Sequence, residues 1–264
     1  MATPVVFIHG LWLHATSWQP WVDLFREAGY DPIAPEWPGG ADTVEQARAN
    51  PDAVAPYGVA AVADHYAEII AGLEQKPVVI GHSFGGLLAQ NLAGRGVTAA
   101  AVAIDPAPIK GVLALPVSAL RVASIALKNP ANRNKAVSLT AEQFRYGFGN
   151  ALSIEESNEL FEKWAIPSPG RPLFEAALAN FNPNAPTKVA TDNTTRGPLL
   201  LTSGGHDHTV PPAIVHGTHK LYAKSTAVTE IKTFADRGHS LTIDHGWQEV
   251  AQTALDFLKT HSIT

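Results

Sequence analysis

The sequence predicts an α/β protein built on a mostly parallel sheet of about six strands, with helices on both faces of the sheet. Two observations carry this prediction. Short apolar runs alternate with amphipathic helical patterns, which is typical of right-handed crossovers between parallel strands. The alternation stops between residues 106 and 196, where only helical patterns recur. We therefore expect one compact unit, with residues 1–105 and 197–264 as the core and residues 106–196 inserted as a helical cap.

The strands and helices of the core are predicted from their apolar patterns. The predicted strands are short runs rich in valine, isoleucine and leucine, as in parallel strands buried on both faces. The clearest helical pattern runs from Val59 to Leu73, and the polar stretch before it, as far as Pro56, is expected to be a loop. The strands are expected at residues 5–8, 31–34, 78–81, 99–104, 198–202 and 228–234, and the helices at residues 18–25, 59–73, 87–92, 211 onward and 247–258.

The inserted segment carries its own helix signals. Thr140-x-x-Gln143 and Ser153-x-x-Glu156 have the spacing of capping boxes, in which the side chains at the two ends bond reciprocally to backbone N–H groups. One helical face is expected to carry Phe174, Leu178 and Phe181. A further apolar set favours an apolar acyl or alcohol group in the substrate: Leu113, Leu115, Leu120 and Leu127.

Composition limits the function classes. The chain has 264 residues, of which 45% are hydrophobic and 16% charged, so it can bury a large core. Its net charge of −5 comes without clusters of basic residues along the sequence, so we expect neither a nucleic-acid nor a membrane partner. It has no cysteine, which excludes disulfides and a cysteine nucleophile. No export signal is apparent after Met1, and we expect a cytoplasmic protein.

The motif that organises the chain is Gly81-His82-Ser83-Phe84-Gly85, which follows a strand-like run and precedes a helical pattern. Its G-x-S-x-G spacing is that of a nucleophile elbow, in which a serine sits on a strained turn between strand and helix. The flanking glycines are needed because a Cβ there would collide with the neighbouring strand or helix. Ser83 is therefore a candidate nucleophile.

Two further candidates lie directly after predicted strands, where the side chains of a parallel sheet can converge on a ligand. Asp207 follows the fifth strand and His239 follows the sixth. An imidazole can take the proton of a serine hydroxyl, and a carboxylate can orient that imidazole. Asp105 also follows a strand and is the competing acid. His206 and His208 lack further ligands at helical spacing, and no metal site is predicted.

At this point the chain resembles the α/β-hydrolase superfamily, in its cofactor-free serine esterase and perhydrolase-like branch. The order Ser83, Asp207, His239 is the chain order of that superfamily. The resemblance implies an oxyanion hole from the backbone N–H groups of Leu11 and Phe84, with Trp12 lining the acyl pocket, and no cofactor. It departs at the start, since two family strands have no counterpart before Val5.

The function expected from these residues is hydrolysis of small to medium carboxylic esters, lactones included, through an acyl-enzyme on Ser83. Two alternatives use the same three residues, peracid formation of the perhydrolase or haloperoxidase type and C–C bond hydrolysis. A third is of another class, a ligand-binding receptor on the same fold that does not turn over. The substrate identity and the oligomeric state are not predicted.

Overall fold

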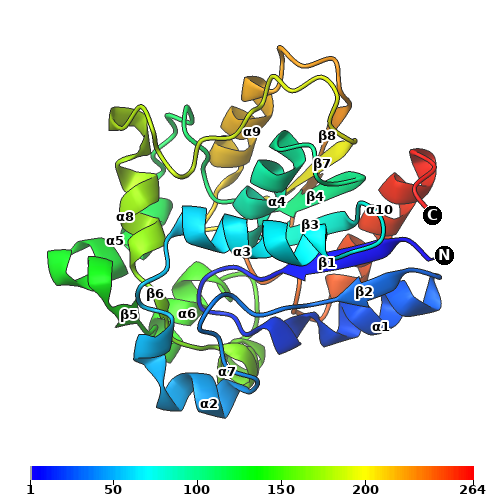
Figure 1. The fold of residues 1–264 in the computed structure, drawn as a ribbon. Coiled ribbons are helices and arrows are strands. Elements are labelled where there is room, and N and C mark those ends of the chain that lie inside the picture. Colours follow the sequence, from blue (N-terminus) through cyan, green and yellow to red (C-terminus); the bar gives the residue numbers. More distant parts are fainter. Residues whose placement is uncertain (1) are drawn as a thin grey trace.

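The computed structural model describes residues 2–264 and contains a six-stranded, fully parallel sheet (Figure 1). The strand order is β2-β1-β3-β4-β7-β8. The chain therefore places β2 on one side of β1, and then adds β3, β4, β7 and β8 in turn on the other side. The prediction of a parallel sheet of about six strands with helices on both faces is confirmed. The strands are β1 (Pro4–Ile8), β2 (Asp31–Ile33), β3 (Val78–His82), β4 (Ala100–Ile104), β7 (Leu199–Gly204) and β8 (Thr229–Phe234).

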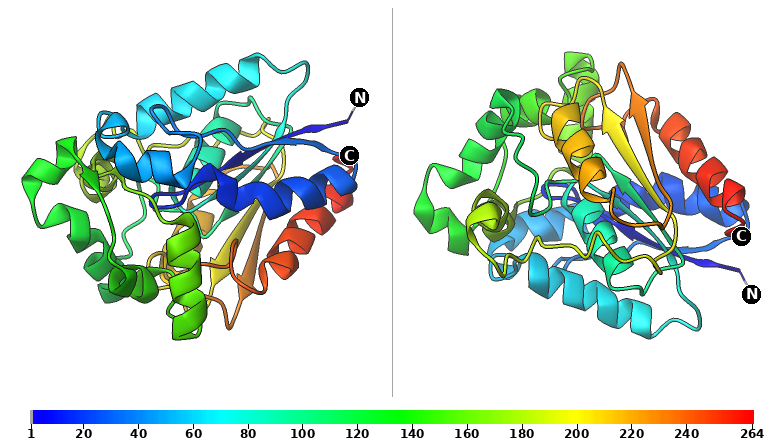
Figure 2. Two further views of the ribbon diagram at one scale, coloured as in Figure 1. Left: turned by 90° about the horizontal axis from the view of Figure 1, so that it is seen from below. Right: turned by 90° about the horizontal axis from the view of Figure 1, so that it is seen from above.

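Helices cover the two faces of the sheet because alternate strand residues point to opposite sides. Val5 and Phe7 of β1 pack in the core beneath α1 (Gln19–Glu27) and α10 (Trp247–Thr260). Val6 and Ile8 join the opposite core, which is covered by α3 (Val59–Ala71), α4 (Phe84–Gly94) and α9 (Pro212–Leu221). The two views of Figure 2 look onto these two helical layers. Both faces of the central strands are therefore covered by helices and shielded from solvent.

The segment between β4 and β7 lies beyond the carboxyl ends of the strands (Figure 1). Its four α-helices pack on one another, and the 3₁₀ turn that follows the first of them contacts a two-stranded antiparallel pair, β5 with β6. The elements are α5 (Val117–Leu127), β5 (Ala136–Val137), α6 (Ala141–Gly147), α7 (Ile154–Trp164), β6 (Ser168–Pro169) and α8 (Arg171–Ala177), with 3₁₀ turns η3 (Pro130–Asn134) and η4 (Ala179–Phe181).

The structure differs from the sequence-based expectation in local detail. The stretch expected to be a loop up to Pro56 contains a helix, α2 (Val44–Ala49), capped by the side chain of Thr43, and a 3₁₀ turn, η2 (Pro51–Ala53). Val44 is the one buried residue of α2, so this helix has no apolar periodicity to detect. The capping box expected at Ser153 is half formed. The Ser153 hydroxyl accepts from the backbone N–H of Glu156, but the Glu156 carboxylate accepts from the N–H of His245 and not from that of Ser153. The Thr140 box is complete.

In residues 2–264, none of the helices is both long enough and apolar enough to cross a bilayer.

Candidate active site

Ser83 occupies a strained turn between β3 and α4. Its φ of 57° and ψ of −119° lie in a region that residues with a Cβ rarely adopt. Four non-glycine residues among 2–264 have positive φ, and three of them are Trp12, Ser83 and Asp105. All three follow the carboxyl end of a strand, so backbone strain is concentrated at one edge of the sheet.

The glycines on either side of Ser83 allow two backbones to come together. A Cβ on Gly81 would lie 2.0 Å from the carbonyl oxygen of Gly85, and a Cβ on Gly85 would lie 2.0 Å from that of Ile8. Gly10 is packed in the same way, since its Cβ would lie 2.7 Å from the Cβ of Ser83. The turn at Ser83 therefore requires three glycines for steric reasons.

Replacing Gly85 with alanine is expected to destabilise the fold by about 3 kcal/mol, because the new methyl group collides with rigid backbone. For a chain of this size that corresponds to a fall in Tm of roughly 6–12 °C. Gly72→Ala is the matched control. Gly72 ends α3 with right-handed helical backbone and its nearest neighbour would be 3.4 Å away, so we expect an unchanged or slightly raised Tm. Equal Tm values for the two variants would contradict this account.

Asp207 and His239 are in direct contact. The Nδ1 of His239 lies 2.5 Å from Oδ2 of Asp207, and both side chains are fully buried. The other carboxylate oxygen of Asp207 accepts hydrogen bonds of 2.7 Å from the backbone N–H groups of Thr209 and Val210. These bonds fix the carboxylate in the turn after β7 and leave one oxygen for the imidazole. Asp207 is thus both the cap of this turn and the partner of His239.

Asp105 lies close to both Asp207 and His239. One oxygen from each carboxylate and a ring nitrogen of His239 lie within 4.8 Å of one another. Asp105 is fully buried at the end of β4, where its Oδ2 accepts a hydrogen bond of 2.9 Å from the N–H of Gly204 and its Oδ1 accepts one of 3.3 Å from the hydroxyl of Thr202. Of the two acids, the one hydrogen-bonded to His239 is Asp207.

Burial controls the charges of this group. Burial, and then the neighbouring charge of Asp207 and a hydrogen bond to it, raises the pKa of Asp105 well above its usual range, which favours the protonated form of this carboxyl. Burial raises the pKa of Asp207 to about 7, against the opposing effect of its hydrogen bonds with Asp105, Val210 and Thr209. Burial also lowers the pKa of His239 to about 4. The imidazole is therefore neutral, as a proton acceptor must be.

The imidazole of His239 is held against the elbow by two aromatic neighbours. Its ring lies 4.5 Å from that of His82, which precedes Ser83, and 4.8 Å from that of Phe148. Nε2 of His82 donates to the carbonyl oxygen of His239 at 2.9 Å. Within residues 2–264, Nε2 of His239 is buried without a hydrogen-bond partner. The free acceptor nitrogen of His239 thus belongs to a ring that packs on His82, the residue directly before the strained serine.

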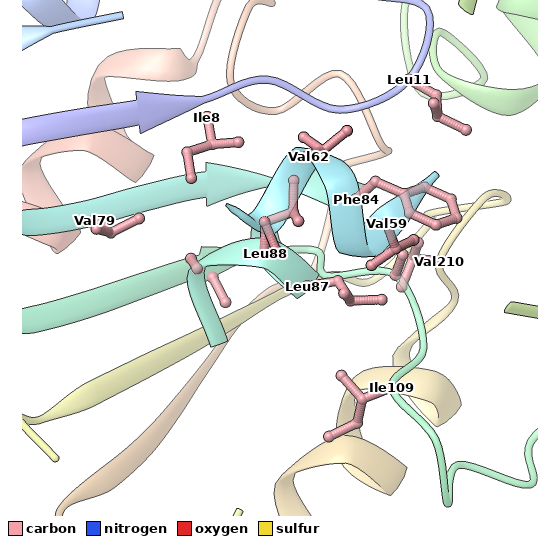
Figure 3. Packing of buried hydrophobic residues seen from close by; sticks show 14 of the residues in the cluster. Ile8, Leu11, Val59, Val62, Val79, Phe84, Leu87, Leu88, Ile109 and Val210 are labelled. Atoms are coloured by element: carbon pink, nitrogen blue, oxygen red, sulfur yellow. The ribbon is translucent and has the colours of Figure 1, made fainter. Parts of the chain in front are cut away.

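Leu11 and Phe84 place two backbone N–H groups at the carboxyl ends of the strands, on the same side of the sheet as Ser83. Leu11 follows Gly10 in the loop after β1, and Phe84 is the first residue of α4, where the amides of a helix have no acceptor within it. Among residues 2–264, neither amide has an intramolecular acceptor. Figure 3 shows Leu11, Phe84, Ile109 and Val210, from four separate segments, on the same side beyond the strands. Both N–H groups are therefore free to donate a hydrogen bond to an oxygen atom of a ligand.

Trp12 fastens the loop after β1 to the segment above it. Its backbone N–H donates to the hydroxyl of Ser168 at 2.6 Å, and its indole N–H donates to the carbonyl of Val137 at 2.9 Å. Its own carbonyl accepts from the N–H of Ile166 at 3.1 Å. The left-handed backbone at Trp12 is thus fixed by three hydrogen bonds. The indole lines the cavity described below.

A carboxylate clamps this loop from the other side, a feature that the sequence analysis missed. Glu36, in the loop after β2, lies 3.2 Å from Nε2 of His9 and 3.1 Å from Nε2 of His14. It also accepts a hydrogen bond of 2.6 Å from the N–H of Ala15. His9 and His14 are therefore structural supports of the loop that carries Leu11. The sequence offered no signal for this, because Glu36 sits in a turn-rich stretch without a motif.

An apolar cavity of about 510 Å³ opens above Ser83. Leu11, Trp12 and Phe84 form its floor together with the serine, and its walls come from the loop after β4, from α5, from α8 and from the turn after β7. Asn180 is one of few polar residues in the lining, and its amide is occupied by the backbone of Gly111 and Val112. The cavity thus presents a largely apolar surface to whatever reaches Ser83.

The cluster of Asp105, Asp207 and His239 also has the composition of a metal site. Ligands in a tetrahedral site each lie about 2 Å from the ion and are farther from one another than the 2.5 Å between His239 and Asp207, which is a hydrogen-bond distance. His206 and His208 do not converge, since His206 is exposed and His208 stacks on Tyr146 with ring centroids 4.7 Å apart. The geometry therefore fits a proton-transfer pair better than a cation site.

With the fold and these contacts established, the class of protein can be stated. Residues 5–253 match the model of the alpha/beta hydrolase family, and the chain belongs to that family. No curated protein matches the sequence.

Solved structures with the same fold are distant in sequence. The chain is similar to a monoacylglycerol lipase from Paleococcus ferrophilus, at 22% identity and a TM-score of 0.68 over 99% of this chain and 97% of that one. It is similar to an extracellular alpha/beta-hydrolase from a Paenibacillus species, at 20% identity and a TM-score of 0.67 over 96% and 98%. It is also similar to a methylesterase from Arabidopsis, at 14% identity and a TM-score of 0.66 over 98% and 100%. At these identities the likeness establishes the shared fold.

Proposed function

We propose that this protein is a serine hydrolase that cleaves small to medium carboxylic esters through an acyl-enzyme on Ser83. The observation that carries the proposal is one arrangement at the edge of the sheet. The ring of His82, which directly precedes a strained serine, packs on a buried imidazole whose Nε2 is free and whose Nδ1 is hydrogen-bonded to a carboxylate. The names of the structurally similar lipase and methylesterase agree with ester cleavage.

In the proposed reaction, Nε2 of His239 takes the proton of the Ser83 hydroxyl as its oxygen attacks the ester carbonyl carbon. The backbone N–H groups of Leu11 and Phe84 stabilise the negative oxygen of the tetrahedral intermediate. The intermediate collapses when the C–O bond to the alcohol breaks, and the imidazolium returns its proton to the leaving alcohol. Water then attacks the acyl-enzyme in the same way, which releases the acid and restores Ser83.

Asp207 is proposed to hold the imidazole in the tautomer that leaves Nε2 free, and to stabilise the imidazolium that forms. Asp105 is proposed to act as a neutral group close to Asp207, because its raised pKa favours the protonated form. The proposal thus uses both acids, in different protonation states, and assigns the contact with His239 to one of them.

The substrate class follows from the cavity. A volume of about 510 Å³ lies in the range of roughly 300–1,000 Å³ that is usual for small-molecule sites. Its apolar walls, including Val112, Leu120 and Val122, favour an ester with an apolar acyl or alcohol group. We propose accordingly that residues 106–196 act as a cap that closes the site from above.

The rate of p-nitrophenyl butyrate cleavage is expected to fall as pH falls through about 7. The reaction needs Asp207 ionised and His239 neutral, and the higher of the two pKa values is that of Asp207, at about 7. Below that value the carboxylate becomes protonated and can no longer stabilise the imidazolium, while above it the rate should reach a plateau. A pH series of kcat/KM with the purified protein tests this. No turnover at pH 8 would contradict the proposed function, and a flat profile down to pH 5 would contradict the role of Asp207.

A further inference from the structure

The mouth of the apolar cavity is rimmed by exposed apolar side chains. Nine large hydrophobic residues are exposed among residues 2–264, and six of them lie in the segment that surrounds this mouth, with exposures from 47% for Leu120 to 88% for Phe181. Isolated exposed hydrophobic residues are ordinary, but a concentration of them at one opening is not. We call these six residues the apolar rim: Leu113, Leu115, Val117, Leu120, Leu178 and Phe181.

The apolar rim is continuous with the cavity. Leu113, Leu115, Leu120 and Phe181 line the cavity as well as being exposed. Val117 and Leu178 do not line it and are 82% and 53% exposed. An apolar path therefore runs from the outer surface of α5 and α8 to Ser83, which allows an apolar molecule to enter without crossing a polar surface.

The same part of the chain is positively charged. Residues 106–141 contain five basic residues, Lys110, Arg121, Lys128, Arg133 and Lys135, and no acidic residue. The rest of the chain carries 14 basic and 24 acidic residues, so the sign of the charge reverses between this segment and the remainder. Four of the basic residues lie on α5 and η3 or directly after them, whereas Lys110 lies in the loop after β4 and donates to the carbonyl of Asn182.

These charges are available to a partner. Lys128, Arg133 and Lys135 are exposed at the end of α5 and on η3, which packs against α8. The nearby acidic residue of α8, Glu175, is directed to α3, where its carboxylate accepts a hydrogen bond of 2.7 Å from the N–H of Val59. Figures 1 and 2 place α5 and α8 at the outer end of the molecule, away from the start of β1 and the end of α10. An extended surface could therefore approach this end without meeting the chain ends.

We propose that the apolar rim docks on an anionic lipid surface, from which a lipid-borne ester passes into the cavity. Apolar side chains enter the boundary of the acyl chains, and nearby cationic side chains pair with anionic headgroups. The charge complementarity selects this occupant over a second copy of the chain, whose identical basic segment would repel its counterpart. The idea deepens the proposed function, since the lipid-borne ester would be cleaved at Ser83. It departs from the expectation of no membrane partner, which rested on the net charge of −5 and the absence of clusters of basic residues in the sequence.

The test is sedimentation of the full chain with vesicles of phosphatidylglycerol and phosphatidylcholine in equal parts, against vesicles of phosphatidylcholine alone. We expect binding to the anionic vesicles that weakens as salt is raised. The double variant Lys128→Glu/Lys135→Glu is expected to bind at least roughly 30-fold more weakly, because two positive charges are lost and two negative charges are added. Val117→Asp/Leu178→Asp is expected to bind at least roughly tenfold more weakly, because its apolar contacts are lost.

Two controls separate docking from folding and from catalysis. Ile154→Asp alters a residue that is 54% exposed at the start of α7, outside the apolar rim, and should bind like the unmodified chain. The variants at Val117, Leu178, Lys128 and Lys135 should all cleave soluble p-nitrophenyl butyrate at the unmodified rate. Ser83→Ala should bind vesicles normally, so a failed esterase assay with retained binding counts against the proposed function alone.

Equal binding to both kinds of vesicle, or to neither, would overturn the docking proposal. So would sedimentation velocity showing a dimer that Val117→Asp/Leu178→Asp converts to a monomer, because the apolar rim would then be an interface between two copies.

Discussion

Replacing Ser83 with alanine is expected to lower kcat/KM for p-nitrophenyl butyrate by roughly 10⁴-fold to 10⁶-fold. The variant loses the proposed nucleophile, while the cavity, the free amides of Leu11 and Phe84 and the His239–Asp207 pair remain. The size of the effect reflects the loss of a covalent pathway, since water bound near His239 would have to replace the hydroxyl. Initial rates in a spectrophotometric assay measure it directly.

Ser203→Ala is the matched control for this experiment. Ser203 is also a buried serine near the carboxyl edge of the sheet, in β7, and its hydroxyl has no hydrogen-bond partner within residues 2–264. The same atom is thus removed from β7, which lies two places along the sheet from β3, and the rate should change by less than about twofold because no bond is lost. An equal loss in both variants would mean that the effect at Ser83 is structural.

The second large effect is expected at Asp207, where substitution by asparagine should lower kcat/KM by about 10³-fold to 10⁴-fold. An asparagine amide can present its N–H₂ group to Nδ1 of His239, which favours the tautomer with the proton on Nε2 and removes the acceptor for the serine proton. The charge that stabilises the imidazolium is lost as well. The measurement is the same ester assay at pH 8, where Asp207 is ionised in the unmodified chain.

Asp105→Asn is the informative companion, because the two acids are within reach of the same histidine. Asparagine has the shape of a protonated aspartic acid and can still accept from Gly204 and donate to Asp207. We expect a loss of no more than about tenfold, since a neutral group replaces a neutral group. If Asp105→Asn lost more activity than Asp207→Asn, the roles assigned to the two acids would be wrong.

Much of this fold is predictable because its strands and helices show regular apolar patterns over many consecutive residues. The buried strands and the helix from Val59 have enough apolar periodicity to be located to within a few residues. The elbow was predictable because Gly81 and Gly85 are required by steric contact with backbone. Asp207 and His239 were singled out by their places after strands, and parallel strands bring such residues to one edge.

The remaining features depend on contacts between distant segments, which one sequence does not encode as a motif. Phe148, which directly follows α6, packs on His239 although it lies 91 positions earlier in the chain, and its residue type says nothing of that partner. Glu36 supports two histidines of another loop. The choice between Asp105 and Asp207 depends on side-chain direction at the ends of two paired strands, β4 and β7. The contacts of η3 with α5 and α8, which bring the exposed Lys128, Arg133 and Lys135 to the same end of the molecule as the apolar rim, likewise appear only in the fold.

The most direct test of the central claim is reaction of the protein with a fluorophosphonate, followed by peptide mass spectrometry. A fluorophosphonate transfers its phosphonyl group to an activated serine oxygen and releases fluoride. The account predicts a single adduct on Ser83, formed quickly in the unmodified chain and much more slowly in the Asp207→Asn variant. An adduct on any other serine, or none at all on a chain that cleaves esters, would contradict the assignment of Ser83 as the nucleophile.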